Sequence, residues 1–307
     1  MKTIPILFTF DDSLILPAGV CISSLLRSAA AETFYDIFIL YSEKYDLENS
    51  DLNRLTETYG NCRLNFRKVG AEFVGAYEIR GIPETAYYRL ISPEIITEYD
   101  KIIYSDVDVI FRSDLAKYYE LDLGTNCFAA VDNCSALRPD VQLEVRDRLG
   151  LDWRNGYYYS GNLVINLRQI REEGLCDKFR ELGHNDYNQQ DMDIMNIACN
   201  GRFLPLGPAF CLTNYLYDLA VKRRADMDAI YGHDAVEEAL RSGIIHYNGA
   251  KPWNGWCHHA DIWWECYRCS PFFDEAFYND FYNQKSTELE RLPLIKRLKL
   301  LARYFIR

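Results

Sequence analysis

The sequence lacks a long apolar run, an excess of basic residues and a dense set of cysteines. None of its apolar stretches approaches the ~20 residues that a membrane-spanning helix needs. The formal net charge is -11. Proteins that bind nucleic acids generally carry a basic balance, so we expect no nucleic-acid partner. Ten cysteines in 307 residues stand mostly alone in apolar stretches, which favours buried free thiols and a reducing cytoplasm.

The first apolar stretch does not resemble a secretory signal peptide. Residues 4–10 read IPILFTF, and Asp11 and Asp12 follow at once without the small residues of a cleavage site. We therefore expect a buried first strand here. Overall, 49% of the residues are hydrophobic and 26% are charged, which is typical of a globular protein.

Short apolar runs then alternate with helical patterns. We expect strands at residues 35–42, 62–69, 101–111, 127–133 and 160–167, and a further strand that begins at 243 and enters a broken loop. We expect helices at 20–30, 47–60, 84–92 (interrupted by Pro93) and 189–201. This alternation predicts an α/β fold with a mainly parallel sheet, which binds ligands at the carboxyl ends of its strands.

Two aspartates stand one residue apart in the apolar stretch YSDVDVIF, residues 104–111. Residues i and i+2 of a strand point to the same side, so Asp106 and Asp108 converge while Val107 points away. Convergent carboxylates repel unless a proton or cation lies between them, and oxygen ligands suit Mg²⁺ or Mn²⁺. The alternative is a solvated turn with two unrelated acids.

The stretch IIHYNGAKPW, residues 244–253, supplies a second group of polar residues. Gly249 permits a close approach of the backbone to a ligand, and Lys251 offers a point charge suited to phosphate. His246 is either a third metal ligand or a core histidine that is hydrogen-bonded to the backbone.

Six stretches, in this order, resemble glycosyltransferase family 8, which contains bacterial lipopolysaccharide galactosyl- and glucosyltransferases and glycogenin. They are TFDD, YYRL, DVDV, SGNLVINL, DMDIMN and HYNGAKPW, and ADIWWECYRCSPFF at 260–273 is similar to bacterial members. The resemblance covers residues 4–273. It implies a GT-A fold, which is a Rossmann-like sheet flanked by helices. It also implies metal-dependent, retaining transfer of galactose or glucose from a UDP-sugar to a cell-surface glycan.

The resemblance also assigns single residues. Asp106, Asp108 and His246 match the Mn²⁺ ligands, and Gly249 and Lys251 match the diphosphate loop. The other assignments are Thr9, Asp11 and Ser13 for the uracil, Arg89 for the diphosphate and sugar, Asp191 for the sugar hydroxyls and Asp132 for the acceptor. Val107, Ser160, Gly161 and Met192 complete the expected UDP-sugar site. Asp191, Lys251 and Arg89 are the expected catalytic residues.

The chain departs from the family pattern at three places. Compared with the family, one residue is missing between Gly249 and Lys251. Tyr159 stands where the family has an asparagine, and we expect Asn162 to take over part of that asparagine's role. The usual glutamine between two aspartates is Met192. Methionine is no nucleophile, which favours front-face displacement over a covalent intermediate; Asp191 remains the alternative nucleophile.

After Glu290 the chain contains only basic charges, at Arg291, Lys296, Arg297, Lys299, Arg303 and Arg307. Leu294, Leu298, Leu301 and Phe305 line one face of a predicted helix. We expect this helix to bind an anionic membrane surface; the alternative is docking on the acidic domain. We therefore expect a GT-A domain at 1–273, a helical extension at 274–307, and a cytoplasmic protein peripheral to the inner face of the cell membrane.

Three further interpretations remain open. The protein could glucosylate a protein or itself, as glycogenin does, or could bind a UDP-sugar without turnover. A sugar-nucleotide pyrophosphorylase is disfavoured because TFDDSL replaces the glycine- and lysine-rich loop of that class. Residues Cys257, His258, His259, Cys266 and Cys269 are either zinc ligands or, as we expect, mostly packed side chains.

Overall fold

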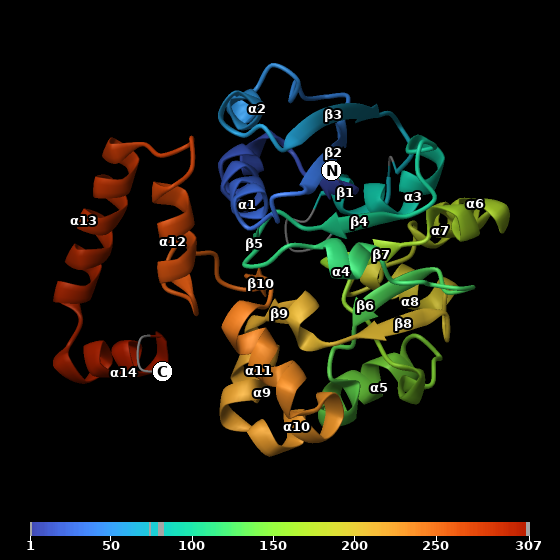
Figure 1. The fold of residues 1–307 in the computed structure, drawn as a ribbon. Coiled ribbons are helices and arrows are strands. Elements are labelled where there is room, and N and C mark those ends of the chain that lie inside the picture. The colour runs from blue at the N-terminus through green and yellow to red at the C-terminus, as the bar shows by residue number, and fades with distance from the viewer. Residues whose placement is uncertain (1, 74, 79–82, 305–307) are drawn as a thin grey trace.

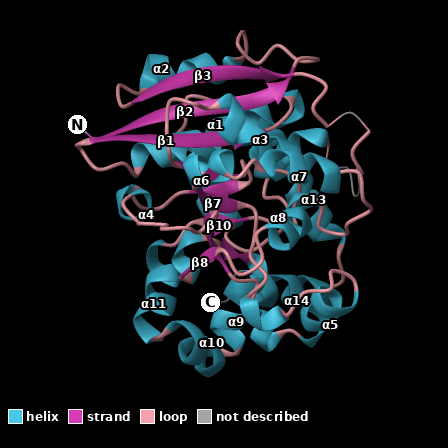
Figure 2. Cartoon of the chain, turned by 90° about the vertical axis from the view of Figure 1, so that its right-hand side faces the viewer, coloured by secondary structure: helices cyan, strands magenta, loops and turns pink. Residues whose placement is uncertain are grey.

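The computed structural model describes residues 2–73, 75–78 and 83–304. Within them the chain forms two sheets surrounded by helices (Figures 1 and 2). The main sheet has the order β3-β2-β1-β4-β7-β6-β8, and the small sheet has the order β5-β10-β9. The strands are β1 (Lys2–Thr9), β2 (Thr33–Ser42), β3 (Cys62–Val69), β4 (Ile102–Ser105), β5 (Val109–Ile110), β6 (Phe128–Val131), β7 (Asn162–Ile165), β8 (Phe203–Leu206), β9 (Leu212–Thr213) and β10 (Ile245–His246).

Helices cover both faces of the main sheet, and a further group lies beyond β8 (Figure 1). They are α1 (Ile15–Arg27), α2 (Arg54–Thr58), α3 (Tyr88–Ile95), α4 (Ala116–Tyr119), α5 (Pro139–Asp147), α6 (Leu167–Glu172), α7 (Leu175–Leu182), α8 (Asp191–Ala198), α9 (Asn214–Lys222), α10 (Arg224–Tyr231), α11 (His233–Ser242), α12 (Ala260–Arg268), α13 (Glu275–Arg291) and α14 (Leu294–Tyr304). The parallel pairs β1–β2, β1–β4, β2–β3 and β6–β8 confirm the predicted mainly parallel α/β sheet.

The apolar run of β1 follows from its place in the middle of the sheet. Ile4, Ile6 and Phe8 belong to the apolar cluster that includes α1, whereas Leu7 belongs to the cluster that includes α3. A parallel strand covered by helices on both faces has no solvent side, so nearly every position is apolar.

The predicted strand at 101–111 is in fact two strands in different sheets. β4 ends at Ser105, the chain turns through Asp106–Asp108, and β5 then joins the small sheet. The Asp106 N–H donates to the Gly161 carbonyl at 2.8 Å, and the Tyr247 N–H donates to the Asp108 carbonyl at 2.9 Å. The single-strand prediction was wrong because apolar residues flank the turn on both sides. The two aspartates therefore lie in a turn at the carboxyl end of β4.

The predicted end of the helix at Pro93 was also wrong. The segment begins as a 3-10 turn at Glu84–Tyr87 and continues through Pro93 to Ile95 as α3. Proline has no N–H to donate to the carbonyl four residues earlier, which belongs to Arg89. Ser92 Oγ donates to that carbonyl at 2.7 Å instead, so this carbonyl keeps a donor and the helix continues.

The C-terminal helices α13 and α14 lie to one side of the α/β body (Figure 1). α13 packs on α12 through aromatic rings, with Trp264 and Phe281 centroids 4.4 Å apart. α14 is the predicted basic amphipathic helix, and its Leu294 and Ile295 are each 69% exposed. Phe305 and Arg307, which belong to the same prediction, lie outside the described residues. Across the described part of the chain, no helix has the length and hydropathy required to cross a bilayer.

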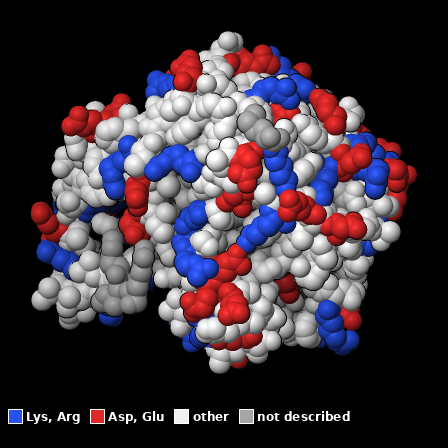
Figure 3. Space-filling model, in the orientation of Figure 1, with Lys and Arg blue, Asp and Glu red and all other residues white. Residues whose placement is uncertain are grey.

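Acidic and basic side chains are interspersed over the face seen in Figure 3. Many of them form ion pairs, as Arg180 does with Glu72 at 2.9 Å. All ten cysteines are free thiols in the structure.

Arg112, which follows β5, connects the small sheet to the end of α11. Its guanidinium donates to the carbonyls of Ala239 at 2.9 Å, Leu240 at 3.2 Å, Arg241 at 3.3 Å and Gly243 at 2.6 Å. Ala239, Leu240 and Arg241 lie in the last turn of α11, and Gly243 follows it. The guanidinium thus lies at the C-terminus of the helix, where a positive charge is favoured.

We expect Arg112→Ala to lower the free energy of unfolding by about 3 kcal/mol, because several charge-assisted hydrogen bonds are lost together. Chemical denaturation measures this change. Arg168→Ala is the control, because Arg168 only approaches the exposed Asp100 at 3.8 Å. That variant should lose less than about 0.5 kcal/mol. Equal losses in the two variants would contradict the role of Arg112.

Candidate functional site

A cavity of about 610 Å³ lies at the carboxyl ends of β1 and β4, where the main and small sheets meet. It occupies the place at which parallel α/β sheets bind their ligands. The predicted site residues that line it are Thr9, Arg89, Asp106, Val107, Asp108, Ser160, Gly161, Asp191, Met192, His246, Gly249 and Lys251.

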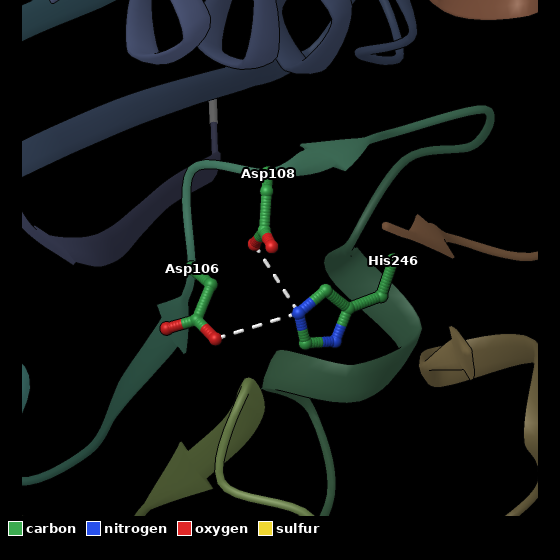
Figure 4. Close-up of side chains that lie close together, drawn as sticks. All are labelled: Asp106, Asp108 and His246. Atoms are coloured by element: carbon green, nitrogen blue, oxygen red, sulfur yellow. Dashed lines mark ion pairs between the residues drawn. The ribbon is translucent and has the colours of Figure 1, made fainter. Parts of the chain in front are cut away.

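Asp106, Asp108 and His246 point toward one another in this cavity and are called the Asp–Asp–His group (Figure 4). His246 Nε2 lies 3.5 Å from Asp106 Oδ2 and 3.2 Å from Asp108 Oδ1. Potential ligand atoms of the three residues all lie within 4.8 Å of one another, and no other such group occurs among the described residues. Carboxylate oxygens and an imidazole nitrogen fit Mn²⁺ or Mg²⁺.

The charges of the Asp–Asp–His group depend on one another. Burial alone would raise the pKa of Asp108, but His246 and Lys251 outweigh burial and hold the pKa of this carboxyl below its ordinary value. Burial alone would lower the pKa of His246, but Asp108 raises that pKa well above its ordinary value. The imidazole lies between two carboxylates, at a place where a divalent cation would fit.

Each carboxylate of the group has its other oxygen held by the protein. Asp106 Oδ1 accepts a hydrogen bond from Tyr104 Oη at 2.6 Å and lies 2.9 Å from Arg89 Nη2. Asp108 Oδ2 accepts a hydrogen bond from Lys251 Nζ. These contacts fix the carboxylates so that Asp106 Oδ2 and Asp108 Oδ1 face the imidazole.

Arg89 connects Asp106 to Asp191. Its side chain is only 6% exposed, and its Nη1 lies 3.3 Å from Asp191 Oδ2. Asp191 is the first residue of α8, where the helix dipole favours a carboxylate. Burial raises the pKa of Asp191, and the charge of Arg89 opposes this increase. One buried guanidinium therefore orients two carboxylates of the cavity.

Gly161 gives the imidazole room to lie against the backbone. A Cβ at position 161 would lie 2.2 Å from His246 Cε1 and 2.9 Å from Asp106 Oδ2. Such distances are far shorter than van der Waals contact. Gly161 is thus a steric requirement of the Asp–Asp–His group.

The residues expected to contact uracil lie near the end of β1. Thr9 lines the cavity, and its Oγ1 is 3.2 Å from Tyr104 Oη. Asp11 Oδ1 accepts a hydrogen bond from the Ser13 N–H at 3.0 Å and caps a 3-10 turn. Asp11 and Ser13 do not line the cavity, although their neighbours Phe10 and Leu14 do.

Two other expectations find no support in the geometry, and neither does the alternative of a zinc site at 257–269. Asn162 is fully buried, donates to Ser105 Oγ at 3.1 Å and does not line the cavity, so it does not replace the missing asparagine. Asp132 accepts hydrogen bonds from Ser135 Oγ at 3.0 Å and the Tyr157 N–H at 3.2 Å, and it also lies outside the cavity lining. Within the described residues, the cysteines and histidines of 257–269 form no group of three convergent metal ligands.

Sequence reasoning missed part of the lining, namely Phe10, Leu14, Pro83, Thr85, Ala86, Gln189, Gln190, Asn248 and Trp253. Asn248 and Trp253 belong to the stretch HYNGAKPW, so their place in that motif was a signal that they line the site. The Pro83–Ala86 segment carries no motif, and only the fold brings it to the cavity. Gln190 has a φ of 45°, in a region that non-glycine residues disfavour. Its amide donates to the Tyr77 carbonyl at 3.0 Å, which ties the start of α8 to residues 75–78.

Comparison with known proteins places the chain in a family. The family described as glycosyl transferase family 8 matches residues 5–257. The chain therefore belongs to glycosyltransferase family 8, as its motifs predicted.

Individual relatives agree with this assignment. The chain is 24% identical over 284 residues to a lipopolysaccharide 1,2-glucosyltransferase of Escherichia coli, covering 88% of this chain and 80% of the relative. It is 22% identical over 286 residues to general stress protein A of Bacillus subtilis, covering 90% and 93%. Among solved structures, the galactosyltransferase LgtC, in complex with donor and acceptor sugar analogues, is similar with a TM-score of 0.73 and 24% identity, covering 90% of this chain and 99% of that one. The chain thus has the predicted GT-A fold.

We expect Gly161→Ala to weaken Mn²⁺ binding by at least about 100-fold, because the added methyl group displaces the His246 ring and the Asp106 carboxylate. Titration calorimetry with MnCl₂ measures this change. Gly60→Ala is the control, since a Cβ there has no neighbour within 4 Å. Wild-type affinity in Gly161→Ala would show that the group tolerates the methyl.

Proposed function

We propose that this protein transfers galactose or glucose from UDP-galactose or UDP-glucose to a cell-surface glycan of the lipopolysaccharide type. The observation that carries this proposal is the convergence of Asp106, Asp108 and His246 in a cavity that also holds Arg89 and Asp191. Membership of family 8 supports hexosyl transfer. Similarity to a lipopolysaccharide 1,2-glucosyltransferase supports the acceptor class.

The donor is held by groups whose chemistry matches its parts. We assign the uracil end to Thr9, which lines the cavity, and to Asp11 and Ser13, which lie next to the lining residues Phe10 and Leu14. Gly249 and Lys251 bind the diphosphate, which Ser160 and Val107 flank. Asp191, held by Arg89 at 3.3 Å, accepts hydrogen bonds from the sugar hydroxyls. The size of the cavity is within the range of small-ligand sites.

Asp106, Asp108 and His246 would hold a divalent cation, Mn²⁺ or Mg²⁺, which would neutralise the charge of the diphosphate leaving group. The protein contributes ligand atoms whose directions are already set. Arg89 and Tyr104 hold one carboxylate, and Lys251 holds the other. Lys251 also supplies a positive charge that stabilises the departing UDP.

Transfer proceeds by front-face displacement, with retention of anomeric configuration. The acceptor oxygen bonds to the anomeric carbon on the side from which UDP leaves, while the bond from that carbon to the β-phosphate oxygen breaks. The acceptor's proton passes to that phosphate oxygen. Met192 lines the cavity but offers no nucleophile for a double displacement. A trapped covalent glycosyl–Asp191 adduct would contradict this mechanism.

A protein that binds UDP-sugars without turnover is the second candidate. Lys251 Nζ donates both to Asp108 and, at 2.7 Å, to the Tyr247 carbonyl, so its charge is already engaged by the protein. Met192 also replaces a polar side chain of the family pattern.

We expect the purified protein to release UDP slowly from UDP-galactose or UDP-glucose in the presence of Mn²⁺, with water as the acceptor. EDTA should abolish this release, and Asp108→Asn should lower its rate by at least about 100-fold, because a charged metal ligand is lost. A screen of UDP-hexoses measures UDP release, and the intact mass of the protein is recorded in parallel.

Asp147→Asn is the matched control, since Asp147 pairs with Arg146 on the surface at 2.6 Å. It should release UDP at the wild-type rate. Binding of UDP with no turnover of any UDP-hexose would favour the second candidate. A gain in protein mass by whole hexose units would favour self-glucosylation of the glycogenin type.

We also propose that the segment 274–307 anchors the transferase domain, residues 1–273, to the inner face of the cell membrane. α14 exposes Leu294, Ile295 and Leu298. Its charged side chains are all basic: Lys296, Arg297, Lys299 and Arg303. An apolar face beside basic charges is typical of helices that lie on anionic membranes.

We expect a chain that ends at Glu290 to bind anionic phospholipid vesicles at least about 100-fold more weakly than the full chain, because six basic side chains and the apolar face are lost. Vesicle sedimentation measures binding, and UDP release shows whether the domain stays intact. Leu298→Asp in the full chain should also weaken vesicle binding, because it places a negative charge on the exposed apolar face of α14. Unchanged vesicle binding by both proteins would refute the anchor.

A further inference from the structure

The imidazole of His246 is confined on two sides by elements outside the Asp–Asp–His group. Gly161 lies against its Cε1, so closely that a methyl group on Gly161 would overlap this carbon. Cys211 Sγ lies 3.5 Å from its Nδ1. His246 is 5% exposed and Cys211 is fully buried, so this contact is shielded from solvent.

The small sheet fixes the position of Cys211. β9 and β10 pair in parallel, with Leu212 opposite Ile245 and Thr213 opposite His246. Cys211 directly precedes β9, and its N–H donates to the Pro208 carbonyl at 3.3 Å. Backbone pairing therefore brings the thiol to the imidazole.

Each member of the Asp–Asp–His group has one polar atom that faces away from the cation position. In Asp106 this atom is Oδ1, which Tyr104 and Arg89 hold. In Asp108 it is Oδ2, which Lys251 holds. In His246 it is Nδ1, which faces the Cys211 thiol.

We infer that Cys211 is a positioning residue for the metal ligand His246. An imidazole that binds a cation through Nε2 carries its proton on Nδ1, and this N–H donates to Cys211 Sγ. The contact therefore holds the ring with Nε2 toward Asp106 and Asp108. Sulfur is a weak acceptor. Removal of the thiol would nevertheless leave the buried Nδ1–H of His246 without this acceptor.

The inference rests on the proposed metal site and concerns how tightly that site binds its cation. Loss of the partner of a metal-ligating histidine typically lowers metal affinity 10–100-fold, and for a weak sulfur acceptor we expect about tenfold. Valine at position 211 keeps most of the volume but has no acceptor. Serine keeps an acceptor, although its Cβ–Oγ bond is shorter than the Cβ–Sγ bond of cysteine. Serine at position 211 should therefore lower the metal affinity less than valine does.

The test measures Mn²⁺ affinity of the full chain from the electron paramagnetic resonance signal of free Mn²⁺. We expect about tenfold weaker binding in Cys211→Val and Cys211→Ala and an intermediate affinity in Cys211→Ser. Cys176→Ala is the matched control, because Cys176 is 1% exposed and contacts the Leu90 carbonyl at 3.5 Å, outside the cavity lining. It should bind Mn²⁺ as the wild type does.

Wild-type affinity in a folded Cys211→Val protein would overturn the inference, and so would equal weakening in Cys176→Ala. If the Cys211 variants do not fold, long-range ¹H–¹⁵N spectra of the Mg²⁺-saturated wild type decide the question. A proton on Nδ1 of His246 supports the inference, and a proton on Nε2 overturns it. A wild type that binds no Mn²⁺ would instead refute the proposed metal site itself.

Discussion

The ion pairs between the buried Arg89 and two carboxylates are the interaction on which the site depends. Arg89 lies 2.9 Å from Asp106 and 3.3 Å from Asp191, and its guanidinium also stacks over Tyr104 at 4.1 Å. A buried charge costs several kcal/mol unless it is paired. The Arg89 guanidinium is therefore stable in the interior only beside the two carboxylates. The carboxylates of Asp106 and Asp191, in turn, can lie near each other only because the positive charge lies between them. This mutual requirement joins α3, the turn after β4 and the start of α8 into one unit.

The second constraint is the passage of the chain from one sheet to the other. β4 belongs to the main sheet, and β5 pairs with β10 in the small sheet, with Val109 opposite His246. That register sets His246 beside Asp108, and the parallel pairing of β9 with β10 adds Cys211 behind the imidazole. The Asp–Asp–His group thus exists because three short strands from distant parts of the chain meet next to the main sheet. Gly161 completes it by leaving space for the ring.

The C-terminal helix α14 differs from the body of the protein in how its apolar and charged side chains are distributed. In the body, apolar residues are buried on both faces of a sheet, and surface charges of both signs are interspersed (Figure 3). In α14, leucine and isoleucine side chains are exposed next to charges of one sign. The net charge of the whole chain is -11, so the sign of the charge on α14 is opposite to that of the protein as a whole.

The sequence by itself determined the α/β class and the family, and it singled out the three residues of the Asp–Asp–His group, because alternating apolar runs and ordered motifs are local patterns. It also determined the amphipathic tail, whose spacing is visible within eleven residues of α14. Only the tertiary structure decided that residues 101–111 split between two sheets, that Asn162 faces the core, and that Pro83–Ala86 reach the cavity. The partnership of Cys211 with His246 spans 35 residues, and no local pattern predicts it. Such contacts depend on strand pairing between distant segments, and pairing is decided by the packing of the whole chain.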